Sequence, residues 1–394
     1  MKNINRRKFL SVSALAGIGT IVAPSIAKAS APSHSELSAA DKKIPTRKLG
    51  KTGLEFPILS MGVMKADNPA VVRAAYNSGI TFFDTAHGYQ NGKNEEMLGT
   101  FFKDKDRKSF YVATKGRGNL NSENFEAEFE EQFNISLKRL QMDYVDVYYY
   151  HAPQDVDTVL NPKIMGMLKK FKAEGRAKFI GFSTHANKPE QIDAAIEAGI
   201  YDVILISYNF TLNILPELDK ALQRGVEAGI GFVAMKTMVG GVEDAEGNKK
   251  VDGAACLRWA WQNPNITTAI PGFTSFDLLD NCLEAAHRPQ LEDTDKKYLA
   301  ALGNCDLLYC QNCEKCVDQC AKHLPIPDIM RAYMYNYGYK QPSISKETLM
   351  SLALTGKECA DCSKCEVQCV SGFNVAEKIA AITPIVHVPD AYLA

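Results

Sequence analysis

The stretch Thr81-Phe82-Phe83-Asp84-Thr85-Ala86-His87-Gly88-Tyr89 joins an apolar run to an acid, and a tyrosine follows the acid by five positions. The β-branched and aromatic residues predict a short buried strand, preceded by a helix at residues 70–77. Asp84 would then lie at the carboxyl end of that strand, where parallel α/β folds place their chemistry. The alternative is structural, with Asp84 capping the next turn and Tyr89 packing over it.

From residue 45 to about residue 286, similar apolar runs alternate with segments of helical period. Eight runs read as strands, at residues 56–61, 81–84, 110–114, 145–150, 178–182, 203–208, 231–235 and 268–270. Helices are predicted between them, at residues 124–140, 162–171, 189–197, 215–227, 253–262 and 276–285. This count predicts an α/β fold, a (β/α)8 TIM barrel over residues 45–290. A doubly wound open sheet competes, but no Gly-x-Gly-x-x-Gly follows the first strand.

Polar side chains able to do proton chemistry follow three consecutive strands of this barrel. Asp84 and Tyr89 follow the second strand, Lys115 follows the third, and His151 follows the fourth. Because the carboxyl ends of barrel strands meet on one face, these four residues are candidates for one catalytic site. Four such residues in order favour the catalytic interpretation over the structural one.

The first 29 residues have the features of an export signal. Arg6-Arg7-Lys8-Phe9-Leu10 precedes an apolar stretch, and Ala27-Lys28-Ala29 offers a small-x-small cleavage site. The paired arginines resemble a twin-arginine signal, with an ordinary secretory signal as the alternative. The apolar stretch is short and contains Gly17, Gly19 and Pro24, so we expect no stable membrane span after signal removal. Residues 30–44 read as a polar linker, and the mature protein is expected in the periplasm.

Composition narrows the class of protein further. The chain has 394 residues, of which 46% are apolar and 23% charged, enough for one large domain and a smaller one. The net charge is −1, and the basic residues of the signal segment account for part of the positive charge. This balance argues against a nucleic-acid partner.

Eight of the 11 cysteines form two matching runs, each of the pattern Cys-x2-Cys-x2-Cys-x3-Cys. The runs are Cys310, Cys313, Cys316 and Cys320, and Cys359, Cys362, Cys365 and Cys369. Disulfides are one interpretation for an exported chain, but pairing such close cysteines would need tight, strained loops. The repeated triplets instead predict ligands of two [4Fe-4S] clusters in a domain over residues 291–394. Cys256, Cys282 and Cys305 stand apart and are expected to be core or helix residues.

At Asp84, Tyr89, Lys115 and His151 the chain resembles the catalytic tetrad of the aldo-keto reductases. Three flanking segments support the resemblance. Residues 47–54 resemble the family's opening hairpin, and Phe83-Asp84-Thr85-Ala86 and Ile270-Pro271-Gly272 fall where the family has them. It implies a small carbonyl or alcohol substrate, with Tyr89 as general acid/base and Lys115 lowering its pKa. Asp84 would anchor Lys115, and His151 would orient the substrate oxygen.

The same resemblance implies a bound NAD(P)(H). The matching positions are Ser183, Thr184, Tyr208, Lys236, Pro271, Gly272, Thr274 and Ser275. Several positions depart from the family's commonest pattern, since Thr184 replaces an Asn, Leu205 a Gln, and Gly272 a Lys. Asp277 lies near an expected Arg, and a carboxylate there would repel a 2′-phosphate. We therefore expect weakened NADP selectivity.

The C-terminal part resembles bacterial two-cluster ferredoxins and is expected to be small and mainly α. In those proteins the fourth cysteine of each run binds the other cluster. The resemblance therefore implies two ligand sets, Cys310, Cys313, Cys316 and Cys369, and Cys359, Cys362, Cys365 and Cys320. Ala321 and Val370 replace the usual proline, and a tyrosine-rich helical stretch at residues 329–339 separates the runs.

These features predict an exported oxidoreductase of aldo-keto reductase type. Its clusters could relay electrons between the barrel site and a redox partner protein. Two alternatives remain open: clusters that only stabilise the small domain, and an electron carrier whose barrel is a scaffold. A relay from a two-electron hydride to one-electron clusters favours a flavin or a tightly retained nucleotide, although no flavin signature is present.

Overall fold

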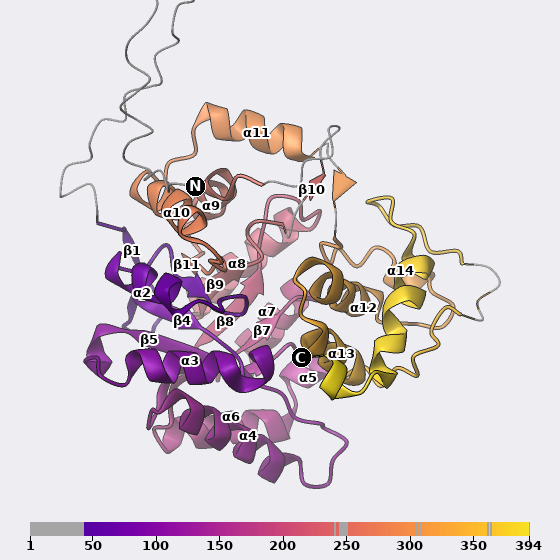
Figure 1. Cartoon of the computed structure of the whole chain (residues 1–394), viewed down its shortest axis with the longest axis horizontal. Coiled ribbons are helices and arrows are strands. Elements are labelled where there is room, and N and C mark those ends of the chain that lie inside the picture. The colour runs from indigo at the N-terminus through magenta and orange to yellow at the C-terminus, as the bar shows by residue number, and fades with distance from the viewer. Residues whose placement is uncertain are drawn as a thin grey trace, which may run out of the picture. The chain divides into compact units, whose positions relative to one another are not determined.

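Eight parallel strands form a nearly closed barrel, as the sequence predicts (Figure 1). The computed structural model describes residues 43–239, 251–303, 309–360, 362 and 365–393, and the backbone of 242–243 and 306–307. The barrel strands are β3 Met61–Gly62, β4 Phe82–Asp84, β5 Tyr111–Gly116, β6 Val145–His151, β7 Ala177–Thr184, β8 Val203–Ser207, β9 Gly231–Met235 and β11 Thr268–Ala269. A bridge between Leu59 and Ala269 brings the last strand back to the first. The predicted signal segment, most of the linker and Cys305 lie outside the described residues.

Helices cover the outside of the barrel (Figure 1). They are α2 Pro69–Asn77, α3 Lys93–Phe102, α4 Phe125–Leu140, α5 Val156–Val159, α6 Pro162–Ala173, α7 Lys188–Ala198, α8 Leu215–Ala228, α9 Gly253–Trp261, α10 Phe276–His287 and α11 Asp293–Gly303. Local residues set their ends. For example, Asn161 accepts the Ile164 N–H at the start of α6, where Pro162 occupies the first turn. Gly229, with φ 97°, ends α8 in the left-handed conformation that favours glycine.

The first predicted strand is wrong in part. Residues 55–57 form β2 Glu55–Pro57, which pairs antiparallel with β1 Thr46–Lys48, so the barrel strand is reduced to β3 Met61–Gly62 and the bridge at Leu59. The reason is Phe56, whose ring stacks on Phe82 inside the barrel at 4.4 Å between centroids. The hairpin therefore closes the amino end of the barrel, and the apolar character of residues 56–61 reflects two different elements.

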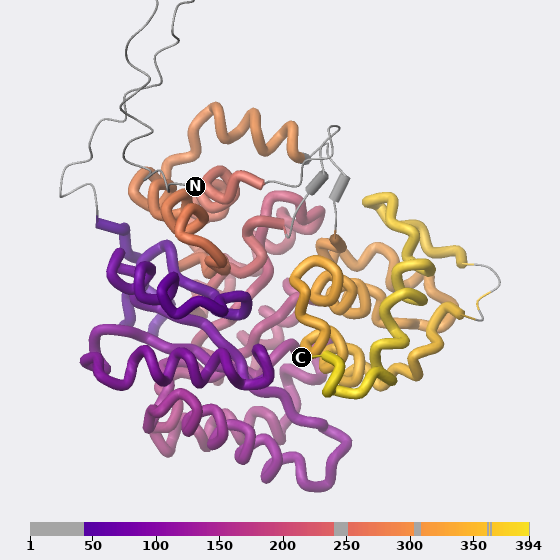
Figure 2. Tube along the Cα trace, in the orientation of Figure 1, coloured from indigo at the N-terminus to yellow at the C-terminus, as the bar shows by residue number. Residues whose placement is uncertain are grey.

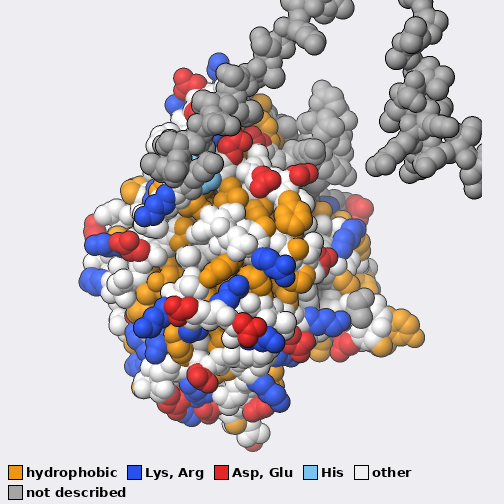
Figure 3. All heavy atoms as spheres, turned by 60° about the vertical axis from the view of Figure 1, so that its left-hand side comes forward, with side chains coloured by type: hydrophobic (Ala, Val, Ile, Leu, Met, Phe, Trp, Pro, Cys, Tyr) orange, Lys and Arg blue, Asp and Glu red, His pale blue; other side chains and the backbone are white. Residues whose placement is uncertain are grey.

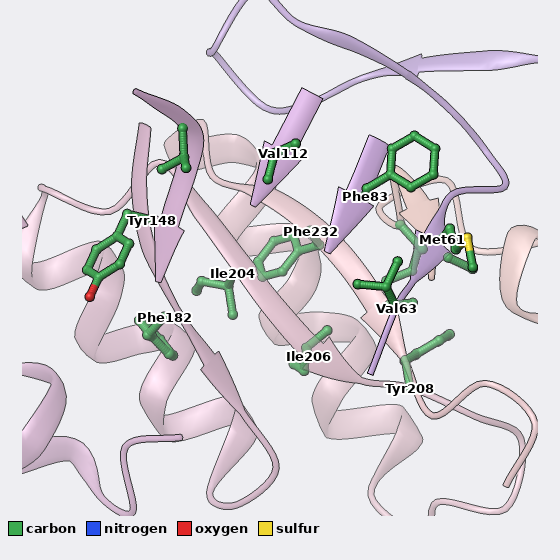
Figure 4. Close-up of a cluster of buried hydrophobic side chains, with 14 of the residues drawn as sticks. Met61, Val63, Phe83, Val112, Tyr148, Phe182, Ile204, Ile206, Tyr208 and Phe232 are labelled. Carbon is green, nitrogen blue, oxygen red and sulfur yellow. The ribbon is translucent and has the colours of Figure 1, made fainter. Parts of the chain in front are cut away.

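Alternation along the strands creates two cores. Phe82, Val147 and Val233 point into the barrel, where they pack with the hairpin residues. Their neighbours Phe83, Tyr148 and Phe232 point outward and pack beneath the helices (Figure 4). Successive strand residues thus serve opposite faces, and every second residue belongs to the barrel interior.

The C-terminal part is a small helical domain, drawn in orange and yellow in Figure 2. Its elements are η3 Val317–Gln319, α12 Ile326–Tyr333, η4 Met334–Gly338, α13 Pro342–Met350, α14 Val375–Ile382, η5 Thr383–His387 and η6 Asp390–Tyr392. Apolar residues of α12 and α14 form its core together with cysteines of both runs. A short pair, β10 Val242–Glu243 with β12 Asp306–Leu307, connects it to the barrel part.

Basic and acidic side chains are interspersed over the face shown in Figure 3, and neither sign gathers on it. Among the helices that the structure describes, none is both long and apolar enough to cross a membrane.

Candidate active site and cluster-binding loops

Strand alternation brings the predicted catalytic residues to one place. Asp84 lies two residues after the inward Phe82, Lys115 two after Ala113, and His151 two after Tyr149. Each therefore points into the barrel at the carboxyl end of its strand. Together with Tyr89, they line one pocket of about 300 Å³ at this end of the barrel.

Asp84 and Lys115 form a buried ion pair. The ammonium of Lys115 donates to Asp84 Oδ1 and to the carbonyl oxygen of Thr85, the latter at 2.7 Å. The two side chains are only 4% and 1% exposed. Burial raises the pKa of Asp84 and lowers that of Lys115, while the attraction between them opposes both shifts. The pair fixes the ammonium next to Tyr89, with Nζ 5.2 Å from the centroid of that ring.

Tyr89 begins the short helix η1 Tyr89–Gly92. Side chains of α4 and α3 hold the neighbouring backbone in place. Arg139 of α4 donates to the carbonyl oxygen of His87 at 2.9 Å, and Asn94 of α3 donates to that of Val63 at 2.7 Å. Gln90 and Asn91 have positive φ values of 52° and 54°, a strained arrangement that often occurs at functional sites.

The electrostatic state of Tyr89 differs from the expectation. Burial raises the pKa of Tyr89 well above its usual range, and Asp84 and the C-terminal residues Tyr335 and Glu347 add to this effect. The expected lowering by Lys115 is therefore outweighed, and the phenol is neutral. His151, whose ring centroid lies 6.0 Å from that of Tyr89, is also neutral because burial and nearby cations depress its pKa.

Most of the predicted cofactor contacts lie at the same pocket. Besides the four residues above, its lining includes Ser183, Lys236, Pro271, Gly272 and Thr274. Thr184, Tyr208 and Ser275 do not line it. Thr184 and Tyr208 each come one position after an inward-facing residue, Ser183 and Ser207 respectively. Their side chains therefore point outward, to the helices. Tyr208 accordingly stacks on Trp259, with 5.1 Å between the ring centroids.

Ser275 caps helix α10, where its hydroxyl oxygen accepts the Leu278 N–H at 3.3 Å. The hydroxyl of Thr184 donates to the carbonyl oxygen of Ala186 at 2.9 Å, and that of Tyr208 donates to Asp219 at 2.9 Å. All three side chains thus have structural partners away from the pocket.

Nothing in the sequence indicates that the C-terminal domain completes the pocket wall. Tyr335 and Tyr339 line it from η4 and the residue after it, opposite Lys65 and Lys236 of the barrel. The Nζ atoms of Lys65 and Lys236 lie 4.3 and 4.7 Å from the Tyr339 ring centroid. The tyrosine-rich stretch was visible in the sequence, but its position over the barrel mouth was not.

The residues present fit a nicotinamide nucleotide. Within the described part of the chain, no ion pair joins Lys65 or Lys236 to a carboxylate, and burial lowers the pKa of both amines. A phosphate group placed beside them would favour their charged forms. At Gly272 a side-chain carbon would meet only the Gly62 carbonyl oxygen, at 3.4 Å, which leaves the backbone open to a ligand. The N-terminus of α10 lies just beyond, and helix N-termini favour phosphate groups.

The cysteines group as the crossed pairing predicts, although their role as ligands stays a prediction. Cys310, Cys313, Cys316 and Cys369 line one cavity, walled by apolar residues of α12 and the loop before α14. The Asn312 N–H donates to Cys310 Sγ at 3.4 Å, a contact of the kind that iron–sulfur proteins use to tune cluster potentials. Among the described residues, no group of three or more His, Cys, Asp or Glu side chains is placed to hold a single metal ion.

The second set is grouped by electrostatics. Burial raises the pKa of Cys359, and Cys365, Cys320 and Cys362 raise it further, so these four thiols are neighbours. Cys362 and Cys365 are exposed, whereas Cys316 of the first set is buried. Cys256 and Cys282 are buried in the barrel part, which confirms the prediction that they are core residues.

Comparison with known proteins identifies both parts. Residues 55–253 match the aldo/keto reductase family, and residues 309–374 match a 4Fe-4S dicluster domain. The chain is 28% identical to a probable aldo-keto reductase 1 of Glycine max, covering 60% of this chain and 83% of that protein. It is 31% identical to an L-galactose dehydrogenase of Arabidopsis thaliana, covering 52% and 69%.

A D-threo-aldose 1-dehydrogenase of a Pseudomonas species is 29% identical, over 51% of this chain and 71% of its own. Among solved structures, the holo form of an aldo-keto reductase from Bacillus halodurans shares the fold, with a TM-score of 0.54 and 22% identity. That similarity covers 66% of this chain and 96% of the other. The chain belongs to the aldo/keto reductase family, as an oxidoreductase of carbonyl or alcohol groups with a C-terminal 4Fe-4S dicluster domain.

Proposed function

We propose that the barrel interconverts a carbonyl and an alcohol with Tyr89 as the general acid/base and a bound nicotinamide nucleotide as the redox partner. One observation carries this proposal: Asp84, Tyr89, Lys115 and His151 converge on a single pocket from four neighbouring elements. When bound, the nucleotide supplies or accepts the hydride. The residues of this chain supply the proton and the orientation.

The neutral state of Tyr89 suits the direction of carbonyl reduction, because a phenol can donate its proton to the carbonyl oxygen. Neutral His151 can donate a hydrogen bond to the same oxygen without adding charge. Lys115 favours the phenolate once the proton has left, and Asp84 holds the ammonium in position.

A sugar-like substrate is the class we propose. Two relatives act on sugars by name, the L-galactose dehydrogenase and the D-threo-aldose 1-dehydrogenase. The pocket also combines polar groups such as Ser183, His185 and Thr237 with apolar side chains such as Met64 and Ile270. Hydroxyl groups along one face of a small polyol would find partners on the polar side.

Tyr89→Phe tests the proposed chemistry. The variant keeps the ring and removes the proton, so turnover of aldoses or of 4-nitrobenzaldehyde should fall by about 10²-fold or more. Tyr148→Phe is a matched control, because this buried hydroxyl has no hydrogen-bond partner in the described part of the chain. Iron content should be unchanged in both variants. Full turnover by Tyr89→Phe would contradict the proposal and favour an electron carrier.

We also propose that the clusters exchange electrons with the barrel site. Cys310 lines a cavity together with His185 and Lys236, and both of these residues also line the catalytic pocket. A hydride carries an electron pair and each cluster accepts one electron, so two clusters can store the pair once an intermediary such as a flavin has split it. Adding reduced nucleotide to the anaerobic protein should therefore bleach the cluster absorbance, and an unchanged spectrum would favour structural clusters.

Export by the twin-arginine pathway is part of the same proposal. It rests on Arg6-Arg7-Lys8-Phe9-Leu10 and the apolar stretch that follows. A variant with both Arg6→Lys and Arg7→Lys should accumulate as an unprocessed precursor. Normal processing of this variant would point to an ordinary secretory signal.

A further inference from the structure

Helix α13 of the dicluster domain brings an acid to the residue that precedes Tyr89. The helix packs on η1, and the carboxylate of Glu347 lies directly against Gly88. A methyl group at position 88 would come within 2.9 Å of Glu347 Oε1 and closer still to Oε2. The lack of a side chain at Gly88 is what permits this approach.

Glu347 and Tyr89 share a cavity. It measures about 40 Å³ and is also lined by His151, which belongs to the catalytic pocket on its other side. This space is large enough for a water molecule, and its walls offer the polar partners that a buried water needs. Glu347 is an exposed residue of α13, but its carboxyl group is desolvated where it lines the cavity, so this group lies between the protein surface and Tyr89.

We propose that Glu347 is a positioning residue that returns a proton to Tyr89 through water in this cavity after each carbonyl reduction. This inference rests on the proposed function. In that reaction the carbonyl carbon gains a hydride, its oxygen gains the phenol proton, and the nicotinamide nucleotide is oxidised. The Tyr89 phenolate then takes a proton from the water, the water takes one from the Glu347 carboxylic acid, and the carboxylate recovers its proton from solvent.

The charged and titratable neighbours of Glu347 come from several elements. Arg117 follows β5, His151 ends β6 and His185 follows β7, while Arg331 lies on α12 and Tyr335 on η4. Arg117 is held in the same contact region, because its Nη1 donates to Ser351 Oγ at 2.7 Å. Desolvation raises the pKa of Glu347, and Arg117 opposes this shift, so the carboxyl group can hold a proton nearer to neutral pH than an ordinary glutamate.

This arrangement assigns the dicluster domain a part in the barrel's proton chemistry. Met334, Tyr335 and Ile344 of this domain pack in one cluster with Tyr89 and Met64 of the barrel. Tyr89 lines both the catalytic pocket and the smaller cavity, whereas Glu347 lines only the smaller cavity, so the proposed proton route does not pass through the catalytic pocket.

The test uses the full-length holoprotein with 4-nitrobenzaldehyde and reduced nicotinamide nucleotide. Glu347→Gln should lower kcat by about 10-fold or more and enlarge the solvent deuterium isotope effect, since proton return becomes slower. Glu347→Ala should lose a similar factor and recover part of it when formate is added. Glu377→Gln, an exposed acid on α14, should match the wild type.

Three results separate the possibilities. Wild-type kcat and isotope effect in Glu347→Gln would overturn the inference. A loss of kcat with an unchanged isotope effect and no rescue by formate would also overturn it, because that pattern reports a structural role. Tyr89→Phe is measured in parallel: if it keeps full turnover, the proposed function itself fails, whereas its inactivity beside an unaffected Glu347→Gln refutes the proton route alone.

Discussion

Asp84→Asn should destabilise the barrel strongly, although the two side chains have nearly the same shape. The substitution removes the negative charge that pairs with Lys115 and leaves a 1% exposed ammonium with uncharged acceptors, the new amide oxygen and the carbonyl oxygen of Thr85. Breaking a buried ion pair from one side typically costs about 3–5 kcal/mol. For a domain of the barrel's size this corresponds to a fall in Tm of about 6–20 °C.

Removing both charges should have a different result. Burial raises the pKa of Asp84 and lowers that of Lys115, which means that the protein destabilises each charged form. Replacing a buried pair by uncharged side chains of similar volume is often neutral or stabilising by about 1–4 kcal/mol. The double variant Asp84→Asn/Lys115→Met should therefore regain the stability that Asp84→Asn loses, while it stays inactive.

The assay is thermal unfolding followed by far-ultraviolet circular dichroism, with cluster absorbance recorded in the same scan. Lys115→Met completes the cycle and should cost less than Asp84→Asn, because the stranded carboxyl group can take up a proton. The absorbance shows whether an early loss of clusters, rather than barrel unfolding, sets the transition. The reasoning is refuted if Asp84→Asn melts with the wild type, or if the double variant is as unstable as the sum of the singles.

Four further variants test other parts of the structure. Cys320→Ser should remove the cluster assigned to the Cys359 triplet and leave the other, so iron and sulfide should fall by about half; loss of the other cluster would refute the crossed pairing. Burial and Arg139 hold the pKa of His87 at about 4, below its unfolded value, so stability present above about pH 6.5 should decline as the pH falls towards 4. His87→Asn should reduce this pH-dependent loss of unfolding free energy by about 1–2 kcal/mol, a range that allows for solvent screening of the part-exposed ring. Unfolding measured at several acidic pH values tests it. Gly181→Ala should lower the free energy of unfolding by about 3 kcal/mol or more, because its methyl group would overlap the Val203 carbonyl oxygen. Gly166→Ala in helix α6 has open space around it and should raise the free energy of unfolding by about 0.5–1 kcal/mol. The Tm of each variant measures the change.

The barrel and its strand ends could be predicted because both follow from local periodicity. Buried strands appear as short apolar runs, and the fixed topology of a (β/α)8 barrel brings all their carboxyl ends together. Asp84, Lys115 and His151 needed no further information, since each is the last inward residue of its strand. The misplaced first strand shows the limit, because Phe56 is as apolar as a barrel residue yet belongs to the closing hairpin.

The cofactor side was less predictable because it depends on single-residue phase. Thr184 and Tyr208 lie one position from inward-facing residues, and an error of one residue exchanges the two faces of a strand. An alignment based on short motifs cannot show which face of the strand each of these residues occupies. The side chains then find local partners, as Tyr208 does on Trp259.

Contacts between residues far apart in the chain could not be predicted from the sequence. Tyr335 and Glu347 lie near Tyr89 in space although about 250 positions separate them along the chain. Their effect on the pKa of Tyr89 could not be inferred either, because the sequence shows that Lys115 is near but not how dry the site is. Desolvation reversed the expected direction of that shift.

The same desolvation links the two domains to the direction of the reaction. Burial of the pocket favours the neutral forms of Tyr89 and His151, and Tyr335 and Glu347 of the dicluster domain push the pKa of Tyr89 further upward. A neutral phenol is a proton donor, whereas alcohol oxidation at this site would need the phenolate that burial disfavours. In the proposed reaction, the packing of the dicluster domain would therefore favour the proton-donating form of Tyr89, which carbonyl reduction uses, whether or not its clusters carry electrons.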